Sequence, residues 1–274
     1  MRIGIIHPAV GEEELENVFA RSAEAGADGV EIHYASAATA LALNDPLHAD
    51  RLAAAAAESG LAVTSLCLHC LAATPSLIGR PEVVQSGQQV VLRALGCAAQ
   101  AAVPAVTIPF FGKNTIEVEE ELNRAADALL ELVDQAEEVG VRLVVETSLA
   151  FHQQQFLLDR LGNTGFVQVS CNPAVALARK LDMPTGIRQL GAGAIAQVRI
   201  KDVRLVDGGP PDFDVPLGEG DVDFRAVAQA LRAVAYDGWV IAEPPVTVHT
   251  ARDSLANARQ AVAFAKALFD GPAA

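Results

Sequence analysis

The segment Ile116–Glu146, IEVEEELNRAADALLELVDQAEEVGVRLVVE, decides the fold class of this chain. It contains an Ala- and Glu-rich helical pattern over Ile116–Glu138, then Gly140, then the short apolar run Val141–Glu146. A helical pattern followed by a short buried run predicts one helix and one strand of a parallel sheet that is covered by helices.

The same arrangement recurs along the whole chain. Alternating helices and buried strands indicate a parallel α/β fold, and eight strands favour a closed (β/α)₈ TIM barrel. A doubly wound sheet is the structural alternative, but no GxGxxG follows the first apolar run, where His7–Gly11 occupies the turn. We therefore expect one TIM-barrel domain over residues 1–274. The eight apolar runs are Arg2–His7, Gly29–His33, Leu61–His69, Val103–Pro109, Val141–Glu146, Phe166–Asn172, Ile195–Lys201 and Gly238–Glu243.

Composition and charge exclude several classes of protein. The chain has 274 residues, of which 51% are hydrophobic, and a formal net charge of −14, so we expect no nucleic-acid partner. Only four cysteines and a beginning without a long apolar segment predict a cytoplasmic protein. The uncharged segment Ala94–Phe111 is interrupted by prolines, which favours helix, turn and strand over a membrane span.

Polar residues stand where the predicted strands end, which is the functional face of such a barrel. Glu146 and Glu243 close strongly apolar runs, and two carboxylates aimed into one barrel mouth suggest a bound cation or a bracketed substrate. Glu31 is either functional or solvated. The other strand-end candidates are His33, His69, Asn172, Arg199 and Lys201.

The histidines and cysteines leave more alternatives open. His33 and His69 suit substrate contact or a structural role, with direct metal ligation less favoured. Cys67 and Cys70 form a CxxC, but strand alternation turns them to opposite faces, so we expect no zinc site there. His48 precedes a predicted helix, and we expect it on the surface.

Five short segments stand near the predicted strand ends: Gly29–Ile32, Leu143–Glu146, Ile200–Asp202, Pro216–Asp221 and Gly238–Glu243. Together they resemble the xylose isomerase-like TIM barrel superfamily, in particular its sugar phosphate isomerase/epimerase group. This resemblance implies a TIM barrel that moves a proton next to a sugar carbonyl. It also implies one divalent metal held by Glu, Asp, His and Glu from strands five to eight, where Glu146 and Glu243 match the two glutamates.

The two remaining metal positions depart from the family pattern. Asn172 stands at the position of the Asp, and Arg199 at that of the His. Arginine has only donors and stays protonated, so it cannot ligate a cation. We expect Arg199 to replace the ion and to pair with Glu146, Glu243 or both. No cofactor is therefore expected; the alternative is one divalent Mn, Zn or Mg held by Glu146, Asn172 and Glu243.

The resemblance and the altered site together predict an isomerase- or epimerase-like protein that acts on or binds a small polyol, ketose or sugar acid. Glu146, Glu243 and Arg199 are the catalytic candidates. A metal-dependent isomerase, epimerase or dehydratase and a non-catalytic sugar-binding relative remain alternatives, and the oligomeric state is open. A repair endonuclease of the same superfamily is disfavoured by the acidic charge. The expected substrate-binding residues are Glu31, His33, His69, Asn172, Lys201 and Glu219, and Lys113 adds to the polar mouth.

Overall fold

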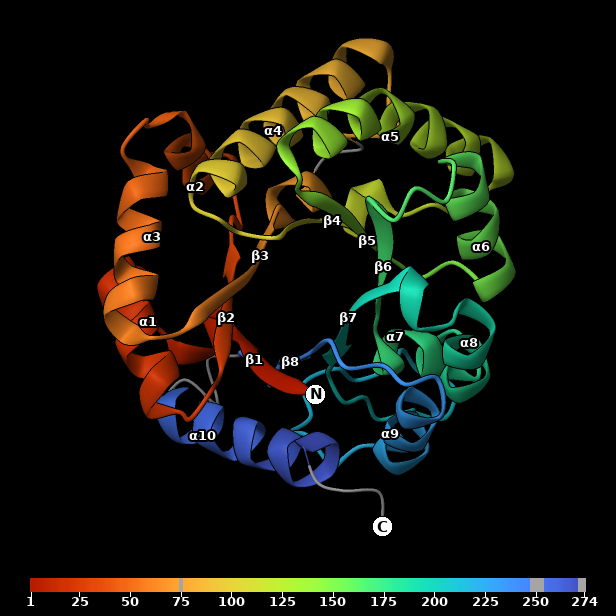
Figure 1. The fold of residues 1–274 in the computed structure, drawn as a ribbon. Helices are drawn as coiled ribbons and strands as arrows, with labels where there is room; N and C mark the ends of the chain where they lie inside the picture. Colours follow the sequence, from red (N-terminus) through yellow and green to blue (C-terminus); the bar gives the residue numbers. More distant parts are fainter. Residues whose placement is uncertain (74–75, 247–253, 271–274) are drawn as a thin grey trace. The chain divides into compact units, whose positions relative to one another are not determined.

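Eight parallel strands alternate with helices in the computed structural model, which describes residues 1–73, 76–246 and 254–270. The strands form a closed barrel in the order β1 to β8 (Figure 1), which confirms the predicted (β/α)₈ fold. They are β1 (Arg2–Ile6), β2 (Gly29–His33), β3 (Ala62–Cys67), β4 (Ala105–Phe110), β5 (Arg142–Thr147), β6 (Val167–Cys171), β7 (Ile195–Ile200) and β8 (Trp239–Ala242).

Ten α-helices lie within the described residues. None of them is long and apolar enough to cross a membrane. They are α1 (Leu15–Glu24), α2 (Ala37–Ala40), α3 (His48–Ser59), α4 (Pro81–Gln100), α5 (Glu119–Val139), α6 (Phe151–Arg160), α7 (Pro173–Ala178), α8 (Met183–Leu190), α9 (Phe224–Ala233) and α10 (Ser254–Ala265).

Contacts between residues divide the chain into two compact units. The boundaries between the units fall within strands β2, β3 and β6. Unit 2 comprises Ile32–Ala54 and Val63–Ser170. The single domain over residues 1–274 stays a prediction. Unit 1 comprises Met1–Glu31, Ala55–Ala62 and Cys171–Ala274.

Within unit 2, α5 shows why the deciding segment folds as it does. Its first turn holds three glutamates, a favourable charge for the positive end of the helix dipole. The Glu121 carboxylate accepts hydrogen bonds from the backbone N–H groups of Glu117 and Val118, at 2.8 and 3.2 Å. Gly140 ends the helix at φ +70°, a left-handed conformation that glycine adopts without strain. α5 lies beside α4 (Figure 1), and the chain continues into β5, which pairs with β4.

Within unit 1, strand pairing brings distant parts of the sequence together. β1 pairs with β2 through Ile6 and Glu31, and with β8 through Ile5 and Ala242. β7 pairs with β8, where Arg199 lies opposite Ile241. Helix α10 packs against β1, and α8 against α9 (Figure 1). This register places the carboxyl ends of β2, β7 and β8 at one edge.

Candidate functional site

The buried guanidinium of Arg199 lies between two carboxylates in unit 1. Its Nη2 donates to Oε1 of Glu31, and its Nη1 donates to Oε2 of Glu243 at 3.4 Å. The side chains are 4% exposed for Arg199, 0% for Glu31 and 16% for Glu243. The predicted ion pair between Arg199 and Glu243 is thus confirmed, whereas the pair with Glu31 was not predicted.

Two further side chains complete this ion-pair network of Glu31, Gln197, Arg199, Lys201 and Glu243. Gln197 donates from Nε2 to Oε2 of Glu31 at 2.8 Å, and Nζ of Lys201 donates to Oε1 of Glu243 at 2.9 Å. Two carboxylates and two protonated cations make the formal charge of the network zero. Burying charges is costly unless they are paired and hydrogen-bonded, and in this network each of the two carboxylates accepts hydrogen bonds from two side chains.

Alternation along β7 explains why Gln197 and Arg199 both donate hydrogen bonds to Glu31. Residues two apart in a strand point to the same face, so both side chains reach the same neighbour. Lys201 continues this spacing just beyond the strand and lies 5.8 Å from the ring centroid of Phe213, a cation–π distance. One carboxylate oxygen of Glu243 is therefore bound by the buried Arg199, and the other by the partly exposed Lys201.

The two remaining positions of the implied metal set are also buried. Glu146 lies in unit 2 near the end of β5, opposite Pro109 of β4 and Ser170 of β6. Its expected pairing with Arg199 stays a prediction. In unit 1, Asn172 is the N-cap of α7.

The residues at these positions do not fit a divalent cation. The side-chain oxygen of Asn172 accepts a hydrogen bond from the backbone N–H of Val175 at 3.2 Å. Arg199 offers only donors. Both oxygens of Glu243 already accept hydrogen bonds from cationic side chains. The predicted absence of a metal from this set nevertheless stays a prediction.

A buried carboxylate that was not among the predicted site residues organises the loop after β7. Asp202 accepts hydrogen bonds from four backbone N–H groups, those of Val203, Gly218, Gly220 and Val222, at 2.8 to 3.3 Å. A Cβ at Gly220 would collide with the Asp202 carboxylate and lie 2.6 Å from the carbonyl oxygen of Val203, so only glycine fits. The sequence signal that points to this role of Asp202 is the glycine-rich segment downstream of it.

Two other predicted site residues are exposed. Glu219 lies in the loop that Asp202 organises, and its backbone carbonyl accepts a hydrogen bond from Arg204 at 2.7 Å. Lys113 is in a short 3₁₀ helix after β4 in unit 2. Both side chains are accessible to a ligand.

Unit 2 brings His33 and His69 together, as neighbours of Cys67. The two imidazole rings stack with centroids 6.1 Å apart and an interplanar angle of 13°. One ligand atom from each of these three residues lies within 4.8 Å of the other two. Cys67 is buried, His33 half-buried and His69 exposed.

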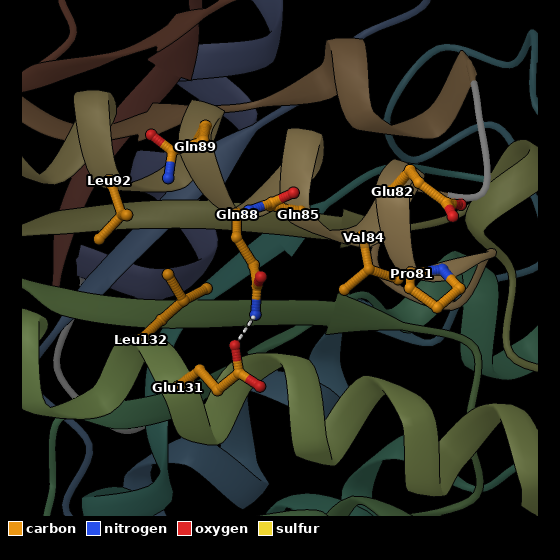
Figure 2. Close-up of a pocket in the computed structure, with 9 residues that line it drawn as sticks. All are labelled: Pro81, Glu82, Val84, Gln85, Gln88, Gln89, Leu92, Glu131 and Leu132. Carbon is orange, nitrogen blue, oxygen red and sulfur yellow. Dashed lines mark hydrogen bonds between the residues drawn. The ribbon is translucent and has the colours of Figure 1, made fainter.

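A surface pocket of about 530 Å³ lies between α4 and α5 in unit 2, away from these clusters in sequence. Figure 2 shows Gln88 reaching from α4 towards Glu131 of α5, and its Nε2 donates to that carboxylate at 2.9 Å. The same amide donates to the carbonyl oxygen of Ala128 at 3.0 Å. These bonds join two outer helices, so we assign Gln88 a role in the packing of α4 on α5.

The chain is a closed parallel barrel with polar side chains at the carboxyl ends of its strands. In this class of barrel the face formed by those strand ends carries the functional site. The chain belongs to the family described as xylose isomerase-like TIM barrel, whose pattern matches residues 19–268.

Curated relatives of the chain are epimerases. The chain is 28% identical over 215 residues to the 2-epi-5-epi-valiolone 7-phosphate 2-epimerase of Actinoplanes sp., covering 77% of this chain and 75% of that protein. It is 27% identical over 244 residues to the L-ribulose-5-phosphate 3-epimerase UlaE of Salmonella typhi, covering 83% and 84%. By sequence the chain is therefore sugar epimerase-like.

Solved structures show the same fold. The 3-keto-D-glucoside 4-epimerase YcjR of E. coli superimposes with a TM-score of 0.76 at 20% identity, covering 97% of this chain and 99% of that one. At this identity the likeness concerns the fold alone.

Proposed function

We propose that this chain is an isomerase or epimerase of a ketose, polyol or sugar acid in which Arg199 takes the place of the family's divalent metal. The observation that carries the proposal is the position of Arg199 between Glu31 and Glu243, with Lys201 on the far oxygen of Glu243. Membership of the xylose isomerase-like family and the epimerase relatives support it.

Epimerisation next to a carbonyl needs a base, an acid and a cation. A base removes the proton from the carbon, negative charge develops on the carbonyl oxygen, and an acid returns a proton to the opposite face. In our proposal Glu243 and Glu146 are the two proton-transfer groups. Arg199 and Lys201 supply N–H donors and positive charge for the developing oxyanion, which is the stabilisation that a metal otherwise provides.

The substrate class follows from the relatives and from the polar residues nearby. Two of the relatives carry a phosphate ester in the name of their substrate, so sugar phosphates belong in any substrate panel. In the proposal, Glu31 and Asn172 help to form the floor of the substrate site. His33, His69, Lys201 and Glu219 are the expected contacts for hydroxyl or phosphate oxygens.

Hydrogen exchange in heavy water tests the proposal even when the product is unidentified. Each ketose, ketose phosphate and sugar acid of a panel is incubated with the protein in D₂O, and NMR follows loss of the proton beside the carbonyl. We expect exchange with at least one compound, unchanged by a chelator and abolished in Glu243→Gln. Glu137→Gln, which changes an exposed carboxylate of α5, is the matched control and should exchange normally.

Other outcomes separate the alternatives. Exchange that is lost on chelation and restored by Mn²⁺ would overturn the metal-free proposal in favour of a metal-dependent enzyme. Thermal stabilisation by a sugar without exchange would favour a non-catalytic sugar-binding protein. The structure offers one observation for that second candidate, because cations hold both oxygens of Glu243. Saturating ligand at 100 times its Kd should stabilise the fold by about 2.7 kcal/mol.

A further inference from the structure

We propose that His33, Cys67 and His69 form a site that binds a zinc ion. All three residues belong to unit 2 and come from the ends of two neighbouring strands and the turn that follows β3. None of them belongs to the metal set that the family resemblance implies. The inference does not rest on Arg199, although His33 and His69 are also among the expected substrate contacts of the proposed function.

Backbone hydrogen bonds bring the three residues together. The N–H of Tyr34, next to His33, donates to the carbonyl oxygen of Cys67 at 2.9 Å. The N–H of Cys70, next to His69, donates to the carbonyl oxygen of Tyr34 at 2.7 Å. These two bonds tie the end of β2 to the end of β3 and to the following turn. The backbone therefore holds His33, Cys67 and His69 close to one another.

Strand alternation places Cys67 on the face of Ser65, and the turn after β3 brings His69 beside it. Ser65, two residues before Cys67, lies with its hydroxyl 3.0 Å from that of Thr107 on β4, which identifies the shared face. Residues two apart in a strand share a face, so Cys67 follows Ser65, whereas His69 begins the short 3₁₀ helix after the strand. The ring of His69 stacks on that of His33, which lies on the neighbouring strand.

The separations suit a metal after small side-chain rotations. The three ligand atoms lie within 4.8 Å of one another. In a tetrahedral zinc site, Zn–S bonds of about 2.3 Å and Zn–N bonds of about 2.0–2.1 Å place the ligand atoms roughly 3.3–3.6 Å apart. We expect rotation about the side-chain bonds of the two histidines to close this difference.

The donor types select the ion. One thiolate and two imidazoles are the ligands of Zn²⁺ and other borderline metals, whereas Mg²⁺, Mn²⁺ and Ca²⁺ prefer oxygen. On binding, the Cys67 thiol loses its proton to solvent and a sulfur–zinc bond forms.

Three protein ligands leave the fourth position of a tetrahedral ion open. Cys67 is buried and His69 is exposed, so the open side faces the solvent. Zinc with three protein ligands and one exchangeable position is the arrangement of catalytic zinc sites, in which water or a substrate oxygen completes the coordination. The site can therefore take a hydroxyl, carboxylate or phosphate oxygen as its fourth ligand.

Cobalt substitution tests the site, because Co²⁺ reports its ligands in its spectrum. The full-length protein is stripped with a chelator, dialysed and titrated with Co²⁺. We expect one equivalent to bind with a thiolate-to-cobalt charge-transfer band in the near ultraviolet and the visible bands of tetrahedral cobalt. Zn²⁺ should then displace the cobalt and raise the melting temperature of the stripped protein.

Three variants make the test specific. Cys67→Ser should abolish the charge-transfer band, and His69→Ala, which changes an exposed side chain, should weaken Zn²⁺ binding by more than the roughly 10–100-fold typical of losing an outer-shell contact. Cys70→Ser is the matched control, because it removes a half-buried thiol three residues away, and should leave both readouts unchanged.

Clear results would overturn the proposal. Cobalt bound without a thiolate band would mean that another set of ligands holds it. An unchanged affinity in His69→Ala, or an equal loss in Cys70→Ser, would remove these three residues as the site. Absence of binding by the folded protein at micromolar metal would do the same. Failure of any kind here leaves the hydrogen-exchange test of the Arg199 proposal untouched.

Discussion

Arg199→Ala should be one of the most destabilising substitutions in unit 1. The change leaves the carboxylate of Glu31, which is fully buried, without the guanidinium that neutralises it, and removes the Arg199 contact of Glu243, which keeps its ion pair with Lys201. Removal of one partner from a buried ion pair costs about 3–5 kcal/mol. Solvent screening does not reduce this figure, because the side chains of Arg199 and Glu31 are 4% and 0% exposed.

Urea and thermal unfolding, followed by circular dichroism, measure this cost. At about 2–4 °C for each kcal/mol, the melting temperature should fall by roughly 6–20 °C. Lys201→Ala is the internal comparison, because this side chain is 25% exposed and its ion pair with Glu243 should contribute no more than about 1 kcal/mol.

A double variant separates charge from packing. Replacing both partners, as in Glu31→Gln with Arg199→Met, removes the unpaired charge and should recover most of the stability lost in Arg199→Ala. If Arg199→Ala cost less than about 1 kcal/mol, or if the double variant were no better than the single one, the buried network would not be the stabilising feature that we describe.

Three other substitutions or conditions test separate features. The double change Asn172→Asp with Arg199→His recreates the family's ligand types and should gain one equivalent of Mn²⁺, measured by electron paramagnetic resonance; Mn²⁺ prefers oxygen ligands, so the cysteine-containing site should not interfere. Burial, and secondarily the nearby Arg51, lowers the pKa of His48 below its usual 6.5. The unfolded state therefore binds more protons, and the free energy of unfolding should be at its full value above about pH 6.5 and fall as the pH is lowered, a dependence that His48→Gln should reduce. Gly220→Ala should destabilise the protein by about 1–3 kcal/mol in urea, since the added Cβ overpacks the loop after β7.

The sequence predicts the fold well because its signals are local. All eight apolar runs are strands in the structure, and Gly29–His33 has the same bounds as β2. The helical pattern over Ile116–Glu138 is observed as α5, Glu119–Val139. A helical pattern also covers residues 251–269, where α10 is observed from Ser254 and residues 251–253 lie outside the described part of the chain.

Side-chain partners were harder to predict because they depend on the register between distant strands. Glu31 and Arg199 are 168 positions apart, and only pairing through β1 and β8 brings them together. His48 was expected on the surface but is buried, which is a correction. Its Nε2 lies 2.8 Å from the hydroxyl of Tyr34, a contact that helix position alone does not indicate.

The cluster of His33, Cys67 and His69 was missed for a related reason. The CxxC pattern pairs Cys67 with Cys70, but β3 ends at Cys67 and Cys70 lies in the short 3₁₀ helix that follows, so the expected strand alternation does not extend to Cys70, which is a correction. The useful signal was the spacing of two between Cys67 and His69, together with a histidine at the end of the preceding strand.

The four hydrogen bonds to Asp202 anchor both ends of the loop after β7, so this loop has an anchored base and an outer part. Above the anchor, Arg204 and Asp212 exchange a pair of backbone hydrogen bonds at 2.8 and 2.9 Å and close residues 205–211 into an outer hairpin. Length and composition can therefore change in that hairpin while Lys201 stays in register with Glu243. This segment can therefore vary among relatives of the chain without disturbing the ion pair between Lys201 and Glu243.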